Sequence, residues 1–187
     1  MKVLIASDIH GSASWAQRLA DEAERLRPDR IVLLGDLLYH GPRNALPQGY
    51  DPMRVAEILN GLAASGRLLA VRGNCDAEVD QMVLNFPCMA DFAQLVDDAG
   101  RTLFFTHGHV HGAGFHNSVD ALPMLPEGSA VVFGHTHIKV NEAAPTHPGV
   151  WAFNPGSLSI PKDGTHSLGR YVSGAPIEEA FSHIVLQ

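Results

Sequence analysis

Short apolar runs alternate with amphipathic segments over the first part of the chain. The runs at residues 3–6, 31–34 and 68–71 are apolar throughout, which predicts buried strands. Between them, apolar residues recur at the spacing that places side chains on one face of a helix. This β-α-β-α-β alternation predicts parallel strands with helices on the outside. The helical spacing is seen in Trp15, Leu19, Ala23 and Leu26, and again in Val55, Ile58, Leu59 and Leu62.

The rest of the chain has shorter apolar runs separated by turn residues. Two of them flank Asp97-Asp98-Ala99-Gly100, which predicts a hairpin. We expect the tail to form a mostly antiparallel sheet, and two sheets packed face to face with helices outside would accommodate both halves. Residues 1–187 are predicted to form one domain. The expected strands are 93–96, 103–106, 130–133, a segment near Val140, 150–153, 170–172 and 177–185.

Composition limits the partners and the compartment. The net charge of −7, with histidines neutral, provides no basic surface for stable nucleic-acid binding. A small nucleotide substrate remains compatible with this charge, because bound metals would add local positive charge. The two cysteines lack a spacing that suggests a disulfide framework, so we expect a reducing, cytoplasmic location. The N-terminal apolar run is too short for a secretion signal, and no run approaches the ~20 residues of a membrane span.

Potential metal ligands lie in five short motifs, each just after an apolar run that predicts a strand. Asp8 and His10 are two residues apart, and such residues in extended backbone point to the same side. Because strand ends can meet at one edge of a sheet, we expect these carboxylate, amide and imidazole groups to hold paired divalent metals. The ligand candidates are Asp8, His10, Asp36, Asn74, His107, His135 and His137.

Each motif taken alone has an ordinary explanation. Asp8 and His10 could be a turn residue and an exposed histidine. Asp36 could cap a helix or a turn, and Asn74 could mark a turn only. Four histidines lie at two strand ends, two after each strand: His107 and His109, and His135 and His137. Together with the three oxygen ligands, they favour a metal site instead.

The motif set resembles the calcineurin-like metallophosphoesterase superfamily, whose pattern is D-x-H, G-D, G-N-H-[DE], a lone H and G-H-x-H. Within it, the runs at 38–47, 73–81, 154–157 and 160–162 are similar to the bacterial YfcE-type phosphodiesterases. The resemblance implies an α/β fold, a four-layer αββα sandwich of two mixed β-sheets flanked by helices. The matching motifs are Asp8-Ile9-His10, Gly35-Asp36, Gly73-Asn74-Cys75-Asp76, His107 and Gly134-His135-Thr136-His137.

The resemblance also implies a cofactor and a mechanism. Two cations about 3.5–4 Å apart would generate a bridging hydroxide that attacks phosphorus in line, without a protein nucleophile. Similar proteins often work with Mn²⁺, which we expect here, with Zn²⁺, Fe or Ni²⁺ as alternatives. They also form dimers or tetramers, so a homo-oligomer is expected. Asp8, His10, Asp36 and His137 would hold the first metal, and Asp36, Asn74, His107 and His135 the second, so that Asp36 bridges.

Cys75 departs from the superfamily pattern, which has a histidine at this position. In the superfamily, that histidine and the following acid, here Asp76, are thought to protonate the leaving oxygen or hold the phosphate. A thiol with an ordinary pKa of ~8.5 is a weak substitute near neutral pH. We therefore expect hydrolysis of small phosphodiesters, with a phosphomonoesterase or nucleotide phosphatase as the alternative. Cys75 could instead only pack beside the site.

Residues around the metal ligands are candidates for catalysis and substrate binding. Arg43 could bind a phosphate or could be a surface or interface residue. His109 could support a metal ligand or face the substrate. A binding scaffold without catalysis is an alternative from another class, which the full ligand set disfavours. The catalytic candidates are Cys75, Asp76 and His109, and the substrate-binding candidates are Asn74, Arg43 and His40.

Two further expectations concern residues away from the metal ligands. The run 154–157 predicts a tight turn that supports the second sheet. Trp15 and Phe115 are apolar residues that could be exposed and contribute to an oligomer interface.

Overall fold

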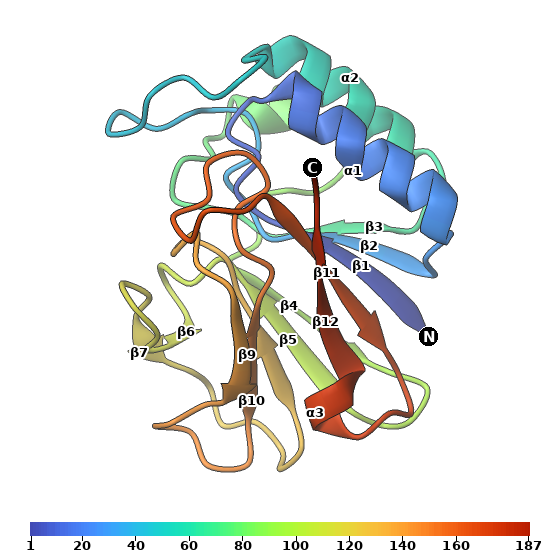
Figure 1. The fold of residues 1–187 in the computed structure, drawn as a ribbon, viewed down its shortest axis with the longest axis vertical. Helices are drawn as coiled ribbons and strands as arrows, with labels where there is room; N and C mark the ends of the chain where they lie inside the picture. The colour runs from blue at the N-terminus through green and yellow to red at the C-terminus, as the bar shows by residue number, and fades with distance from the viewer.

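The computed structural model describes all 187 residues, which form two five-stranded sheets and a small two-stranded hairpin (Figure 1). The strands of the first sheet are β1 (Lys2–Ala6), β2 (Arg30–Leu33), β3 (Leu68–Ala70), β11 (Ser167–Val172) and β12 (Phe181–Val185). Their order is β12-β11-β1-β2-β3. The predicted parallel strands at the start of the chain are confirmed, because β1 pairs with β2 and β2 with β3 in parallel register.

Two helices connect the parallel strands and cover the outer face of the first sheet (Figure 1). Helix α1 (Ala13–Leu26) begins after Ser12, whose hydroxyl accepts a hydrogen bond from a first-turn N–H. It ends at Arg27, which adopts the left-handed conformation common at helix ends. Helix α2 (Pro52–Ala63) begins after Asp51, whose carboxylate caps the helix in the same way. Both helices therefore begin at ordinary N-cap residues.

The second sheet consists of β4 (Phe92–Val96), β5 (Thr102–Thr106), β8 (Ala130–Val132), β9 (Val140–Ala143) and β10 (Trp151–Asn154). Its order is β4-β5-β8-β10-β9, with β5, β8 and β10 parallel and an antiparallel strand at each edge. The expectation of a mostly antiparallel tail is wrong. The connections between β5, β8 and β10 are long enough to return the chain in the same direction, and β11 and β12 leave this sheet to join β1.

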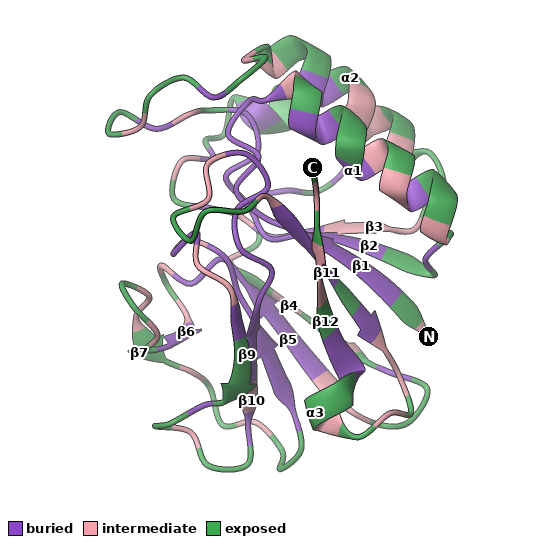
Figure 2. Ribbon diagram, in the orientation of Figure 1, coloured by how far each residue is buried: buried purple, intermediate pink, exposed green.

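The two sheets pack face to face and share an apolar core. Val3 and Val32 of the first sheet belong to the same buried cluster as Phe105, Val132 and Phe153 of the second. Figure 2 shows the burial of the inner strands and the alternation of buried and exposed positions on α1 and α2. The predicted α/β class with two mixed sheets packed face to face is confirmed by this arrangement, with the two long helices on the first sheet.

The outer face of the second sheet is covered mainly by extended chain. The hairpin of β6 (Gly112–Ala113) and β7 (Asp120–Ala121) lies in this segment, where Phe115 and Leu122 pack on the outer cluster of the sheet. The remaining elements are a single 3-10 turn, η1 (Asp80–Met82), and a four-residue helix, α3 (Ile177–Ala180). None of the helices combines the length and apolarity that crossing a bilayer requires.

Two local expectations from the sequence are wrong. Residues 177–180 form α3 instead of continuing the last strand, since Pro176 starts a helical turn and the strand begins only at Phe181. Trp15 is buried with 9% of its surface exposed, because it packs in the core under α1 and stacks on the His166 ring at 3.7 Å between centroids. Phe115 is also partly buried.

Candidate active site

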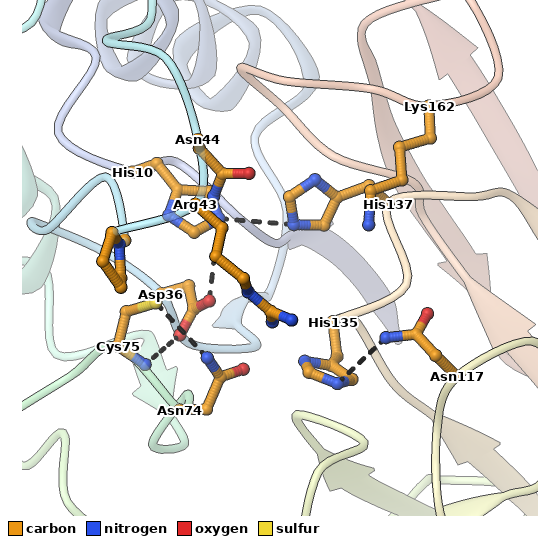
Figure 3. A pocket seen from close by; sticks show the side chains of 12 residues that line it. His10, Asp36, Arg43, Asn44, Asn74, Cys75, Asn117, His135, His137 and Lys162 are labelled. Carbon is orange, nitrogen blue, oxygen red and sulfur yellow. Dashed lines mark hydrogen bonds and ion pairs between the residues drawn. The ribbon is translucent and has the colours of Figure 1, made fainter.

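The ligand candidates lie at the carboxyl ends of strands from both sheets. Asp8 and Asp36 follow β1 and β2, Asn74 follows β3, and His107 and His135 follow β5 and β8. Because these strands run parallel within their sheets, their carboxyl ends reach the same edge of the sandwich. Figure 3 shows the resulting cleft, which has a volume of about 320 Å³.

Five of the ligand candidates have backbone in the left-handed region. Non-glycine residues rarely adopt it, and clusters of such residues are typical of sites that require a fixed side-chain direction. The turn after β1 is held against the turn after β2 by two hydrogen bonds, in which the Asp8 and His10 N–H groups donate to the carbonyls of Gly35 and Asp36. The φ angles are 57° at Asp8, 49° at His10, 54° at Asp36, 66° at His135 and 60° at His137.

Three histidines are oriented by hydrogen bonds from Nδ1 to backbone carbonyl oxygens. The His10 ring bonds to the Tyr39 carbonyl at 2.9 Å and the His107 ring to the Leu34 carbonyl at 2.7 Å. The His137 ring bonds to the Ile160 carbonyl at 2.8 Å. A proton held on Nδ1 leaves Nε2 as the ligating nitrogen, and these three Nε2 atoms lie 3.1–3.7 Å from carboxylate oxygens of Asp8 or Asp36.

The Asp8 carboxylate is held firmly and still has one free oxygen. Oδ2 accepts hydrogen bonds from the Ser7 hydroxyl at 2.6 Å and from the His135 N–H at 3.1 Å. Oδ1 is buried without a hydrogen-bond partner, 3.1 Å from Nε2 of His137 and 3.7 Å from Nε2 of His10. A buried, unpartnered carboxylate oxygen is costly unless a cation satisfies it. Asp8, His10 and His137 therefore fit the ligand set of one metal.

Asp36 lies between two groups of imidazoles. Its Oδ2 is 3.6 Å from Nε2 of His10 and 3.5 Å from Nε2 of His107. Nε2 of His107 is in turn 3.0 Å from Oδ1 of Asn74. One carboxylate that reaches both groups is suited to bridging two cations.

The charges of the buried site respond to one another. Burial disfavours a charged His107, but the neighbouring Asp36 and Asp8 carboxylates outweigh this effect and raise the His107 pKa to about 9. Burial, with repulsion from His107, lowers the pKa of His135 to about 4. A cation bound at His107 would displace its ring proton, whereas His135 is already neutral near neutral pH.

His135 is more peripheral than the other ligand candidates. Its ring centroid is 5.1 Å from that of His107, and its Nε2 is 3.2 Å from the Asn117 amide nitrogen. The site thus brings Asp8, His10, Asp36, His107 and His137 together most closely, with Asn74 beside them, while His135 completes one wall of the cleft.

Cys75 and Asp76 differ in what they face. The Cys75 thiol lines the cleft, and burial together with the Asp36 charge raises its pKa to about 12, so it stays protonated. The Asp76 carboxylate is buried and accepts hydrogen bonds from the N–H groups of Asp36, Leu37 and Gly73 at 2.7–2.8 Å. Asp76 therefore fastens the turn after β2 to the turn after β3, and it does not line the cleft.

The remaining candidates lie at different distances from the cleft. Arg43 is exposed and lines it, whereas His40 does not and packs edge-on against Tyr39 and Tyr50. His109 is half-buried and does not line the cleft, and its ring centroid is 5.2 Å from that of His107. Burial, reinforced by His107, lowers the His109 pKa to about 4, so it is neutral.

Sequence reasoning missed several residues that shape the site. Lys162 and Asn117 line the cleft, and Figure 3 shows Lys162 and Arg43 on loops from different parts of the chain. The only earlier signal for Lys162 was its place in the run 160–162. The turn at 154–157 supports the site directly, because the Ser157 hydroxyl donates to the Asp8 carbonyl at 2.9 Å and the Asn154 amide donates to the Gly134 carbonyl at 2.8 Å.

The fold and this ligand-rich edge define the class of protein. The chain belongs to the calcineurin-like phosphoesterase superfamily, whose domain matches residues 1–172. Members of this superfamily use divalent metals, and the donor groups described above suit such ions.

Particular relatives are similar over most of the chain. Phosphodiesterase YfcE of Escherichia coli (strain K12) is 47% identical over 164 residues, which cover 88% of this chain and 83% of the relative. The solved structure of YfcE, a phosphoesterase from E. coli, matches with a TM-score of 0.85 and 40% identity over 100% of both chains. A structure described as an archaeal phosphodiesterase matches with a TM-score of 0.65 at 21% identity over 100% of both chains, a likeness of fold.

Proposed function

We propose that this protein is a divalent-metal-dependent phosphodiesterase that hydrolyses small phosphodiesters at the cleft in Figure 3. The observation that carries the proposal is the position of Asp36, whose Oδ2 faces His10 on one side and His107 on the other. The first cation would be held by Asp8, His10, Asp36 and His137. The second would be held by Asp36, Asn74, His107 and His135.

The metals would supply the nucleophile and neutralise charge on the phosphoryl oxygens, because bound cations lower the pKa of water and act as Lewis acids. The protein contributes orientation and charge. The Nδ1 bonds of His10, His107 and His137 hold each Nε2 toward the Asp8 or Asp36 carboxylate. Arg43 and Lys162 place two cationic groups at its rim, where a phosphodiester anion would enter. Mn²⁺ is the proposed metal, with Zn²⁺, Fe or Ni²⁺ as alternatives.

A preference for diesters over monoesters is supported by Cys75. A neutral thiol donates weakly to a departing alkoxide or to the second charge of a monoester. In the metal-free site, burial and the Asp36 charge raise the Cys75 pKa to about 12, so the thiol there is protonated. The volume of about 320 Å³ suits a small substrate, and the net charge of −7 disfavours stable nucleic-acid binding.

The test is hydrolysis of an aryl phosphodiester and the matching monoester by metal-stripped protein and by protein reloaded with Mn²⁺, Zn²⁺ or Mg²⁺. We expect metal-dependent cleavage that favours the diester. Asp36→Asn should reduce it at least roughly a hundredfold, the effect of removing one electrostatic group at a reacting centre, whereas the surface variant Asp21→Asn should not. Two bound ions per chain without turnover would contradict the proposal and support the binding-scaffold alternative. Faster cleavage of the monoester would support the phosphatase alternative.

A further inference from the structure

A second cavity adjoins the candidate active site and has a different character. Its volume is about 360 Å³, and its walls are mostly apolar. Cys75 lines both this cavity and the metal-binding cleft, so the two spaces meet at one side chain. The apolar walls include Leu38, Tyr39, Tyr50, Met53, Val79 and Val83.

Some of these apolar side chains are unusually exposed. The exposed fractions are 42% for Tyr39 and 61% for both Met53 and Val79. Concave apolar surface beside a polar site is typical of ligand binding, because covering it releases water from the wall. The one charged lining residue, Asp80, is buried and accepts a hydrogen bond from the Ala77 N–H at 2.9 Å. The cavity therefore presents little charge to an occupant.

The two tyrosine walls of the cavity pack against the ring of His40. The His40 ring lies edge-on to Tyr39 at 4.7 Å and to Tyr50 at 5.3 Å between centroids. This three-ring arrangement joins the loop after β2 to the segment that precedes α2. A cavity with fixed walls loses little conformational entropy when it is filled.

We propose that this cavity is a subsite for an aromatic or similarly apolar ester group of the phosphodiester substrate. The inference rests on the proposed function, because the phosphate would lie in the metal-binding cleft while one ester group crosses Cys75 into the apolar cavity. The substrate class is thus an anionic phosphodiester with at least one ring-sized apolar substituent. His40 is then a positioning residue for the tyrosine walls and does not contact the phosphate.

The experiment measures binding separately from turnover. Dibenzyl phosphate and dimethyl phosphate carry the same charge and have poor alkoxide leaving groups, so their affinities for the metal-loaded protein can be compared by titration calorimetry. We expect dibenzyl phosphate to bind at least roughly tenfold more tightly, the effect of burying part of one ring. The preference should fall below about threefold in Met53→Gln/Val79→Asn, with dimethyl phosphate affinity unchanged. Met124→Gln, at a fully exposed residue that does not line the cavity, is the matched control and should retain the preference.

The outcomes separate this inference from the proposed function. Equal affinity for the two esters in the unaltered protein, or a benzyl preference that survives the double substitution, would overturn the subsite. A double variant that keeps the preference but changes mass in light scattering would identify the surface as an interface between copies of the chain, and would likewise overturn it. Benzyl preference that depends on Met53 and Val79, in a protein that hydrolyses no aryl diester, would sustain the subsite and contradict the phosphodiesterase. Diester turnover without benzyl preference would sustain the phosphodiesterase and overturn the subsite.

Discussion

The backbone N–H of Cys75 donates a hydrogen bond to Oδ1 of Asp36 at 2.8 Å. This bond occupies one oxygen of the carboxylate and leaves Oδ2 directed at His10 and His107. The turn after β3 thereby determines which oxygen of Asp36 is available for metals. The side chain of the same residue, Cys75, faces the cleft, so one residue both orients the central carboxylate and lines the cleft.

Replacement of Cys75 by histidine should raise monoesterase activity. An imidazole at this position could donate a proton or a strong hydrogen bond to the leaving oxygen, an effect commonly worth 10²–10⁴-fold. We expect kcat/KM for an aryl monoester to increase at least roughly tenfold relative to that for the diester. Cys75→Ser, which restores a donor without a base, is the control. Unchanged monoester turnover in Cys75→His would argue that Cys75 only packs beside the site.

Metal affinity should rise with pH up to about 9. In the absence of metal, Asp36 and Asp8 overcome the effect of burial and raise the His107 pKa to about 9, so below that pH a proton occupies the ring and competes with the cation. Each pH unit below 9 should therefore weaken binding by about tenfold for each proton displaced. Calorimetry of Mn²⁺ binding in two buffers with different ionisation enthalpies would count the released protons. Binding that releases no proton at pH 7 would show that the metal does not displace a proton from His107.

The sequence predicted which ligand candidates lie close together better than it predicted the residues around them, for a physical reason. Asp8, Asp36 and His107 follow buried strands, and parallel strands necessarily bring their carboxyl ends to one edge. Lys162 and Asn117 lie in loops whose paths depend on tertiary packing, so spacing carried no information about them.

The errors in the fold have a similar origin. The buried runs of β5, β8 and β10 indicate strands but not their direction, which depends on where the long connections between them run. The support that Ser157 gives to Asp8 joins residues at opposite ends of the chain and has no local signature.

Removal of the Ser7 hydroxyl should weaken metal binding as well as the fold. The hydroxyl donates to Oδ2 of Asp8 at 2.6 Å in a fully buried environment and fixes the direction of Oδ1. Loss of such a supporting bond typically lowers metal affinity 10–100-fold, and Ser7→Ala should also lower the free energy of unfolding by ~1–3 kcal/mol.

Ser129→Ala provides the comparison for Ser7→Ala. Ser129 is equally buried, but its hydroxyl donates to the Pro126 carbonyl, away from the metal ligands. Chemical denaturation and chelator competition should show similar destabilisation in the two variants and a loss of Mn²⁺ affinity in Ser7→Ala alone. Equal Mn²⁺ affinity in both would show that the Asp8 carboxylate does not depend on Ser7.

A methyl group at Gly73 should disrupt the site, whereas one at Gly61 should not. A Cβ at Gly73 would lie 2.1 Å from Oδ1 and 2.3 Å from the backbone nitrogen of Asp36, far inside contact distance. Gly73→Ala must therefore displace the turn that carries Asp36, and we expect diesterase activity to fall at least roughly a hundredfold, as a displacement of about 1 Å does in other active sites. Gly61 lies within α2 and has open space around its Cβ position, so Gly61→Ala should raise the free energy of unfolding by ~0.5–1 kcal/mol and leave activity intact. Diester hydrolysis and urea denaturation of both variants provide the measurement. An active Gly73→Ala enzyme would mean that the turn after β3 can move without carrying Asp36 out of place, and it would contradict the role of the Cys75 N–H in orienting that carboxylate.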